Sequence, residues 1–318
     1  MPIIMPITAR TYRGDEDIER VRALLRETFE LEDRPGGNWH VADFDYWRWH
    51  CLENVVERPP DDLLLWEDEN ERLVAVALQG DPGVVHFQIH PAHRTAALGR
   101  AMIDAAEAQY AAPMPDGKRR VYLWTDVDDA ERQSLLRERG YETYQSPHSR
   151  QRQARVDLAR PLPEAPVPAG YVVRSMGGPE DLPARSLASW RAFHPDEPDD
   201  GCDPTGSWYR SVQRASLYDR DLDVVSVAPD GDIASFSTGY YDDASRTAVL
   251  VLAGTAPPHQ RKGLAKAVVV EMLRRLRDRG AVAAYVSSYE PPAHALYRSA
   301  GFTDVVLAEA WRKTLPRI

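Results

Sequence analysis

The chain has 318 residues, of which 43% are hydrophobic and 28% are charged. Because domains usually hold roughly 100–200 residues, this length and composition predict two globular domains. Acidic side chains outnumber basic ones by 49 to 39, and the net charge of -10 repels polyphosphate backbones. The composition therefore argues against a nucleic-acid-binding protein.

The cysteine content and the N-terminus bear on the compartment. Cys51 and Cys202 lack the paired spacing of a zinc site or a disulfide framework, which favours free thiols, a reducing environment and no bound metal. The apolar start is interrupted by Pro2 and Pro6 and lacks the features of a signal peptide. No apolar run approaches the length of a membrane span. We expect a cytoplasmic protein without membrane contact, either a monomer or a homodimer.

Short motifs recur along the chain in the same order. Ala9–Thr11 and Glu16–Ile18 return 164 residues later as Val173–Ser175 and Glu180–Leu182. Two further pairs follow at nearly the same offset: Pro91–Arg94 with Pro257–Gln260, and Arg139–Tyr141 with Ala300–Phe302. A nearly constant offset predicts an internal duplication.

A proline-rich segment, residues 161–170, separates the two copies. Its four prolines oppose both helix and sheet and favour an extended linker. The sequence therefore predicts an N-terminal domain over 1–160 and a C-terminal domain over 171–318. The alternative is a proline-rich surface loop inside one large domain.

Within each copy, the hydrophobic pattern predicts a strand, helices, two or three strands, a helix, a strand, a short helix and a final strand. This order is typical of an α/β fold with a mixed (α+β) sheet. In the second copy we expect strands over 247–253 and 281–287. A helix from 263 to 280 and a short helix over 292–300 are expected between and after them.

The join between strand and helix in the second copy, residues 260–266, carries the first chemical motif. One glycine, Gly263, opens a helix whose first amide N–H groups have no partner in the chain. The helix dipole adds about half a positive charge there, so the helix end favours an anion such as a pyrophosphate. Without a ligand, the same residues would be an ordinary basic helix start.

This motif resembles the signature of the GNAT superfamily of N-acetyltransferases, in which Gln or Arg, two residues, Gly, one residue, and Gly or Ala hold the pyrophosphate of coenzyme A. The resemblance implies two tandem GNAT-type acyl-CoA N-acyltransferase domains and acetyl-CoA as cosubstrate. It also implies that the end of the preceding strand offers backbone groups to the thioester. The implied cofactor-binding residues are Ala253, Gly254, Thr255, Gln260, Arg261, Lys262, Gly263, Leu264, Ala265 and Lys266.

The second motif, Ala293–Phe302, resembles the family's A-x-x-L-Y-x-x-x-G-F, whose tyrosine protonates the departing thiolate. Tyr297 is therefore the candidate general acid, a role typically worth about 10²–10⁴ in rate. Its alternative reading is a core aromatic residue of an amphipathic helix. The family commonly has Asn at the position of Glu290, which is a possible general base here. Asp242, Asp243, His194 and a water chain are the other candidates for that proton.

The first copy departs from both motifs. Ala97 stands at the position of Gly263 and Leu136 at that of Tyr297, so the copy lacks the acid and places a methyl group at the phosphate turn. We expect a degenerate domain with a structural or substrate-shaping role, with or without residual acetyl-CoA binding. A tandem chain with one failing copy resembles the mycothiol synthases in architecture, and the likeness is not extended to their substrate.

The acceptor is suggested by a local acidic segment, residues 194–203, which holds five carboxylates and no lysine or arginine. In the family that the motifs resemble, this region borders the acceptor site, so the resemblance and the charge together favour a cationic primary amine. Candidate contacts are Phe193, Asp196 and Trp208, with Trp190 and Tyr209 as further aromatic walls. A solvated loop with helix-capping aspartates is the alternative. At the level of function, the alternatives to a small-molecule N-acetyltransferase are a non-catalytic acyl-CoA-binding scaffold and an enzyme that acetylates protein or peptide amines.

Overall fold

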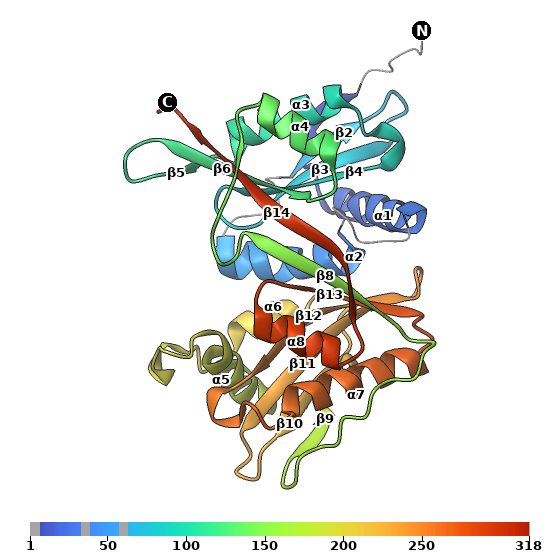
Figure 1. Ribbon diagram of the computed structural model, residues 1–318, viewed down its shortest axis with the longest axis vertical. Coiled ribbons are helices and arrows are strands. Elements are labelled where there is room, and N and C mark those ends of the chain that lie inside the picture. Colours follow the sequence, from blue (N-terminus) through green and yellow to red (C-terminus); the bar gives the residue numbers. More distant parts are fainter. Residues whose placement is uncertain (1–6, 33–38, 57–62, 318) are drawn as a thin grey trace. The chain divides into compact units, whose positions relative to one another are not determined.

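The computed structural model of the protein describes residues 7–32, 39–56 and 63–317 (Figure 1). The chain forms two compact units. Unit 1 comprises Met1–Arg152 and Val306–Ile318, and unit 2 comprises Gln153–Val305. No helix within the described residues is both long and apolar enough to span a bilayer.

Unit 1 is a sheet with helices on both faces. The sheet has the order β1 (Thr8–Thr11), β2 (Leu64–Glu67), β3 (Leu73–Gln79), β4 (Val84–Ile89), β6 (Arg119–Asp126) and β14 (Thr303–Leu315), with the short strands β5 (Ala112–Pro113) and β7 (Glu142–Thr143) at its margin. Helices α1 (Asp15–Glu32) and α2 (Val41–Tyr46), continued by a π-helix at Trp47–Val56, share one apolar cluster with β2 and β3. Helices α3 (Ala96–Gln109) and α4 (Ala130–Glu138) share the other.

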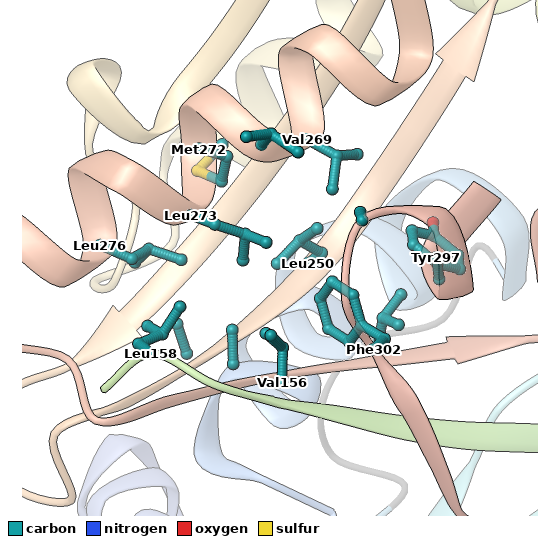
Figure 2. Packing of buried hydrophobic residues seen from close by; sticks show 14 of the residues in the cluster. Val156, Leu158, Leu250, Val269, Met272, Leu273, Leu276, Tyr297 and Phe302 are labelled. Carbon is teal, nitrogen blue, oxygen red and sulfur yellow. The ribbon is translucent and has the colours of Figure 1, made fainter. Parts of the chain in front are cut away.

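Unit 2 repeats this plan. Its sheet has the order β8 (Arg150–Asp157), β13 (Ala283–Ser288), β12 (Thr247–Thr255), β11 (Ile233–Asp242), β10 (Asp223–Val227) and β9 (Val172–Ser175). The helices are α5 (Leu182–Phe193), α6 (Ser207–Gln213), α7 (Leu264–Asp278) and α8 (Pro291–Ser299). Helix α7 buries its apolar stripe, including Val269, Met272, Leu273 and Leu276, against the sheet (Figure 2). The elements expected from the sequence around α7 are therefore present within a few residues of their predicted bounds.

The duplication is visible in the hydrogen bonds of each unit. In unit 1, Arg10 pairs with Asp17 at 2.6 Å, and the same carboxylate accepts from the backbone N–H of residue 13 at 2.8 Å. In unit 2, Arg174 pairs with Asp181 at 2.5 Å, and that carboxylate accepts from the N–H of residue 177 at 2.7 Å. Every partner is displaced by 164 residues. The sequence repeat thus reflects two copies of one structure.

The units divide the chain differently from the boundaries suggested by the prolines. Residues 161–168 form neither helix nor strand, and Leu162 and Ala165 pack against the core of unit 2. The last strand, β14, pairs with β6 from Ala308 opposite Asp126 to Leu315 opposite Arg119, so the C-terminal segment belongs to unit 1. Strand pairing depends on which distant segments of the chain meet, and the proline pattern carries no information about it.

We predict that Trp311→Ala weakens unit 1 although residue 311 lies close to the C-terminus. The indole is 2% exposed in the core of unit 1, and removing such a side chain typically costs about 3–5 kcal/mol. Amide hydrogen exchange in β6 should accelerate, whereas exchange in β11 should stay unchanged. Val305→Ala, an exposed position on the same strand, is the matched control. Equal acceleration in β6 and β11 would contradict the assignment of β14 to unit 1.

Candidate active site

Strands β12 and β13 of unit 2 diverge in the middle of the sheet. They run parallel and pair from Thr247 opposite Ala283 to Leu250 opposite Val286, after which β12 continues to Thr255 paired with β11 and no longer with β13. On its other side, the register between β11 and β12 shifts so that Val251 is an extra residue. Such a bulge bends the strand and disrupts the β11–β12 ladder locally, and the ladder resumes at Leu252 opposite Thr238. The half-buried end of β12, residues 253–255, therefore lies at an opening in the sheet.

The N-terminus of α7 lies just beyond this opening in the chain. Gly263 is the N-cap with a left-handed φ of 87°, and no side chain caps the helix. A Cβ added at Gly263 would meet nothing within 4 Å, so the glycine is required for its backbone conformation and not for lack of space. Arg261 also has a positive φ, of 63°. The first-turn N–H groups thus remain available to an anion.

The side chains around the N-terminus of α7, residues 260–266, are mostly basic. We call this end of the helix the helix mouth, and hydrogen bonds hold the side chains of Gln260 and Lys262 beside it. The Gln260 side chain donates to the carbonyl oxygen of Thr255 at 3.1 Å, which ties the loop to the end of β12. Lys262 Nζ donates to Tyr171 Oη at 3.1 Å and to the carbonyl oxygen of Pro258 at 3.0 Å. The Arg261 guanidinium is exposed and forms no ion pair with any of the described residues. Positive charge without a protein counterion therefore surrounds the free amides.

Tyr297 lies on the buried face of α8, in the same core cluster as Leu250 and Val269 (Figure 2). Its ring meets Phe302 edge to face, with 5.7 Å between centroids, and the side chain is 8% exposed. The hydroxyl makes no hydrogen bond to the described part of the chain, yet it is not fully enclosed. Burial raises the pKa of Tyr297 to about 12, so the phenol keeps its proton at neutral pH. Tyr297 is thus a core aromatic residue whose phenol stays protonated at neutral pH, and its role as a general acid remains a prediction.

The candidate bases are widely separated. Glu290 is the N-cap of α8 directly after β13, is exposed, and forms no side-chain bond to the described residues. Asp242 lies at the opposite end of β12, opposite Thr247, where its carboxylate accepts from Ser245 N and Oγ in a tight turn. A role for Asp242 near residues 253–255 is therefore ruled out by its position. Asp243 adjoins the same distant turn.

The predicted acceptor residues lie around α5 and the loop that follows it. Phe193 is 53% exposed and contacts Phe236 edge to face at 6.2 Å. Phe236 in turn lies against Gly254, where an added Cβ would be 2.5 Å from its ring. Asp196 is exposed, and Trp208 donates to Ser186 Oγ at 2.8 Å. Tyr209 is fully buried, so the expectation that it forms an open aromatic wall is wrong.

Part of the acidic segment has a structural role. Asp199 forms an ion pair with Arg191 at 2.7 Å. Asp203 accepts from the N–H and hydroxyl groups of Ser207 and Thr205, and these hydrogen bonds hold its pKa well below the usual range. The remaining carboxylates of the segment are exposed and make no bond to the described residues. They are Asp196, Glu197 and Asp200.

A buried polar cluster behind Phe236 was not expected from the sequence. Asp223 accepts from Tyr209, Tyr218 and Thr238 at 2.6, 2.9 and 3.1 Å. The Arg185 guanidinium carbon lies 4.2 Å from the ring centroid of Tyr209 and 3.7 Å from that of Phe236. The sequence carries only a weak signal for this cluster: the helical spacing places Arg185 on the same face of α5 as the buried Leu182 and Ala188. The cluster supports Phe236 and, through it, the open end of β12.

The corresponding helix mouth of unit 1 is closed by its own side chains. Helix α3 begins at Ala96, two residues before Leu98, the counterpart of the first α7 residue Leu264. Thr95 caps it by accepting from the N–H of Leu98 at 3.2 Å. Ala97 is therefore a helical residue and does not project a methyl group into a glycine-type turn, as the sequence had suggested. Leu136, at the position of Tyr297, is buried.

Arg94, beside the same mouth, is paired with a carboxylate. It donates to Glu32 at 3.0 Å, so the positive charge nearest the α3 N-terminus is neutralised. Over the described ranges of both units, no group of three or more His, Cys, Asp and Glu side chains is arranged to hold a metal ion.

Comparisons with known proteins also find the same fold twice in the chain. The model of the acetyltransferase (GNAT) family matches residues 18–141 and 187–302, once in each unit. A mycothiol acetyltransferase of Clavibacter sepedonicus is 30% identical, with 93% of this chain and 94% of that protein covered. One from Clavibacter michiganensis is 29% identical over 98% of this chain and 97% of that protein.

Solved structures agree on the fold of the whole chain. A GCN5-related N-acetyltransferase from Sphaerobacter thermophilus has a TM-score of 0.67 at 19% identity and covers 99% of this chain and 98% of its own. A tandem GNAT protein from the clavulanic acid biosynthesis pathway has a TM-score of 0.62 at 14% identity, covering 97% and 98%. With the family model matched in both units, the chain is a member of the GNAT family, an acetyl-CoA-dependent N-acetyltransferase with two tandem GNAT domains.

Proposed function

We propose that acetyl transfer takes place in unit 2 and that its acceptor is a primary amine on a small cationic molecule. The contrast between the two helix mouths carries this proposal. At Gly263 the first-turn amides are uncapped and the nearby Arg261 has no counterion among the described residues. In unit 1 the corresponding amide, that of Leu98, is capped by Thr95, and the neighbouring Arg94 is paired with Glu32. Among the described residues, the α7 N-terminus in unit 2 therefore combines free donors with free positive charge, as a diphosphate requires, and the α3 N-terminus in unit 1 does not.

In this proposal, residues 260–266 bind the pyrophosphate of acetyl-CoA, and the open end of β12 holds the thioester. The amine nitrogen attacks the acetyl carbon directly, and the carbon–sulfur bond breaks. A backbone N–H among Ala253, Gly254 and Thr255 would stabilise the oxyanion that develops on the acetyl oxygen. The interruption of pairing after Leu250 supports this assignment, because it frees backbone groups on that edge.

Two proton transfers complete the reaction. Tyr297 donates its phenolic proton to the departing thiolate, a role supported by its raised pKa and by a hydroxyl that is not fully enclosed. Glu290, exposed at the start of α8 and without a side-chain partner in the described chain, accepts a proton from the ammonium group of the acceptor, directly or through water, which leaves the neutral amine to attack.

The acceptor class is supported by the exposed groups near the open strand. Phe193 offers an apolar face, and Trp208 lies on the following helix. Asp196 and its unpaired acidic neighbours offer negative charge to an ammonium group. Relatives named mycothiol acetyltransferases favour a small-molecule acceptor over a protein. In this proposal, unit 1 does not catalyse acetyl transfer.

We predict that Gly263→Ala weakens coenzyme A binding by about tenfold. A left-handed conformation costs a non-glycine residue roughly 1–2 kcal/mol, which here would oppose the turn that exposes the amides. Titration calorimetry with coenzyme A measures the effect. Gly231→Ala is the matched control, since Gly231 also has a positive φ with open space around it but lies in the β10–β11 turn. Equal losses in both variants would refute a special role for the α7 mouth.

Replacing Tyr297 by phenylalanine removes the proton donor and keeps the ring. We expect kcat to fall by about 10²–10⁴ while the affinity for coenzyme A changes little. Thiol release from acetyl-CoA across a panel of amines is the assay. Tyr241→Phe, on β11 opposite Ala248 and remote from the open end of β12, should retain full activity. An unchanged kcat in Tyr297→Phe would leave the binding-scaffold reading as the better one.

The raised pKa of Tyr297 gives a separate test by stability. Unfolded tyrosine titrates near pH 10, whereas the buried phenol holds its proton to about pH 12. The stability conferred by that bound proton is complete below pH 10 and is lost as the pH rises towards 12, at roughly 1 kcal/mol per unit. The free energy of unfolding of the wild type, relative to Tyr297→Phe, should therefore stay constant to pH 10 and fall above it. If the difference in unfolding free energy between wild type and Tyr297→Phe stays constant up to about 1.5 pH units above pH 10, the phenol is solvated and its pKa is not raised.

A further inference from the structure

Unit 1 contains a cavity of about 400 Å³ between α3, α4 and the ends of β4 and β6. Strands β4 and β6 pair only at Val84 opposite Tyr122 and Val85 opposite Leu123, so they diverge as β12 and β13 do in unit 2. The large apolar side chains of the lining come from β4 and from both helices. They are Phe87, Ile89, Ile103, Leu135 and Leu136. This size and lining are typical of a site for a small organic molecule.

The cavity wall carries one cation that lacks a protein partner. The Arg132 guanidinium carbon lies 5.5 Å from the ring centroid of Phe87, and the guanidinium forms no hydrogen bond or ion pair with the described residues. Its pKa is lowered by burial, against the opposing effect of nearby Asp129 and Asp126, so the charge is poorly solvated. An arginine stays charged under these conditions. The guanidinium therefore offers unused donors to an anionic group inside the cavity.

Negative charge lies at the same cavity. Asp128 and Glu131 line it, are exposed, and make no side-chain bond to the described residues. Asp129 also lines it but is occupied as the N-cap of α4, where it accepts from the N–H of residue 132 at 2.9 Å. The cavity lining thus combines, within the described residues, a guanidinium and two carboxylates without protein partners with an apolar surface.

The same cavity is poorly suited to a diphosphate. Five of its lining residues are acidic and two are basic. One of the two, Arg94, is already paired with Glu32, and Thr95 occupies the Leu98 amide at the helix mouth. A ligand with several negative charges would face repulsion without the free amides that compensate for it in unit 2.

We propose that this cavity binds a zwitterionic α-amino acid with an apolar side chain. Its carboxylate pairs with Arg132, its ammonium group with Asp128, and its side chain covers Phe87 and the neighbouring apolar residues. One arginine and one carboxylate on the wall match the two charges of the ligand. The opening between the diverged strands of unit 1 thus serves small-molecule recognition, and not acyl transfer. This inference concerns unit 1 and does not depend on the catalytic assignment of unit 2.

The test is titration calorimetry of the full-length chain with L-leucine and L-phenylalanine. L-Leucinamide and N-acetyl-L-leucine, each lacking one of the two charges, should bind at least about tenfold more weakly than L-leucine, the equivalent of one lost charge pair. Arg132→Gln should abolish binding. Arg137→Gln, on the same helix and outside the cavity, should leave it intact. Leucine binding that persists in Arg132→Gln would place the ligand elsewhere, for example at the amine acceptor site, and overturn the proposal.

A second variant guards against a folding defect. Ala96→Trp fills the cavity wall and leaves Arg132 in place, so it should also lose leucine binding while keeping the thermal unfolding midpoint near that of the wild type. Coenzyme A should bind with one equivalent per chain and should not compete with leucine. Two equivalents, or displacement of leucine by coenzyme A, would show that unit 1 binds the cosubstrate instead. Equal affinity for leucine and leucinamide would also refute the proposal.

Discussion

The function proposed for this chain depends on one backbone conformation, the left-handed turn at Gly263. Because glycine adopts a φ of 87° at no steric cost, α7 begins abruptly there and no side chain satisfies its first amides. In the proposed function, those amides, the helix dipole and Arg261, which has no ion pair with the described residues, together bind an anion at the end of the open strand. Unit 1 has no glycine at this position. Its helix extends backwards by two residues and acquires a threonine cap.

The opening in each sheet has a separate physical origin. In unit 2, parallel pairing stops at Leu250 where the bulge at Val251 redirects β12. In unit 1, β4 and β6 keep only two paired positions before they diverge. The opening is therefore common to both copies, whereas the uncapped helix N-terminus and the tyrosine at position 297 have no counterpart at the corresponding positions of unit 1, Leu98 and Leu136. The two copies share a scaffold and differ in the groups that could bind phosphate and donate a proton.

Burial sets the chemistry of the remaining groups. Enclosure among Leu250, Val269 and Phe302 keeps Tyr297 protonated, which suits a proton donor and would not suit a nucleophile. The buried Arg185 guanidinium lies against the ring of Phe236, and Asp223 accepts from the neighbouring Tyr209. This polar cluster supports Phe236, whose ring lies against Gly254. On the surface, Arg191 and the α6 cap use Asp199 and Asp203, leaving only part of the acidic segment for a ligand.

Several properties were determined by the sequence alone. Helical spacing fixed α7, the glycine fixed its start, and the repeated Arg and Asp residues specified the same local network in each copy, because these features depend on neighbours within a few turns of chain. Tertiary structure decided the rest. The membership of β14 in unit 1, the burial of Tyr209, the remoteness of Asp242 and the cavity around Arg132 all depend on which distant segments meet. Strand pairing and burial are long-range properties, and residue type and local spacing do not encode the partner.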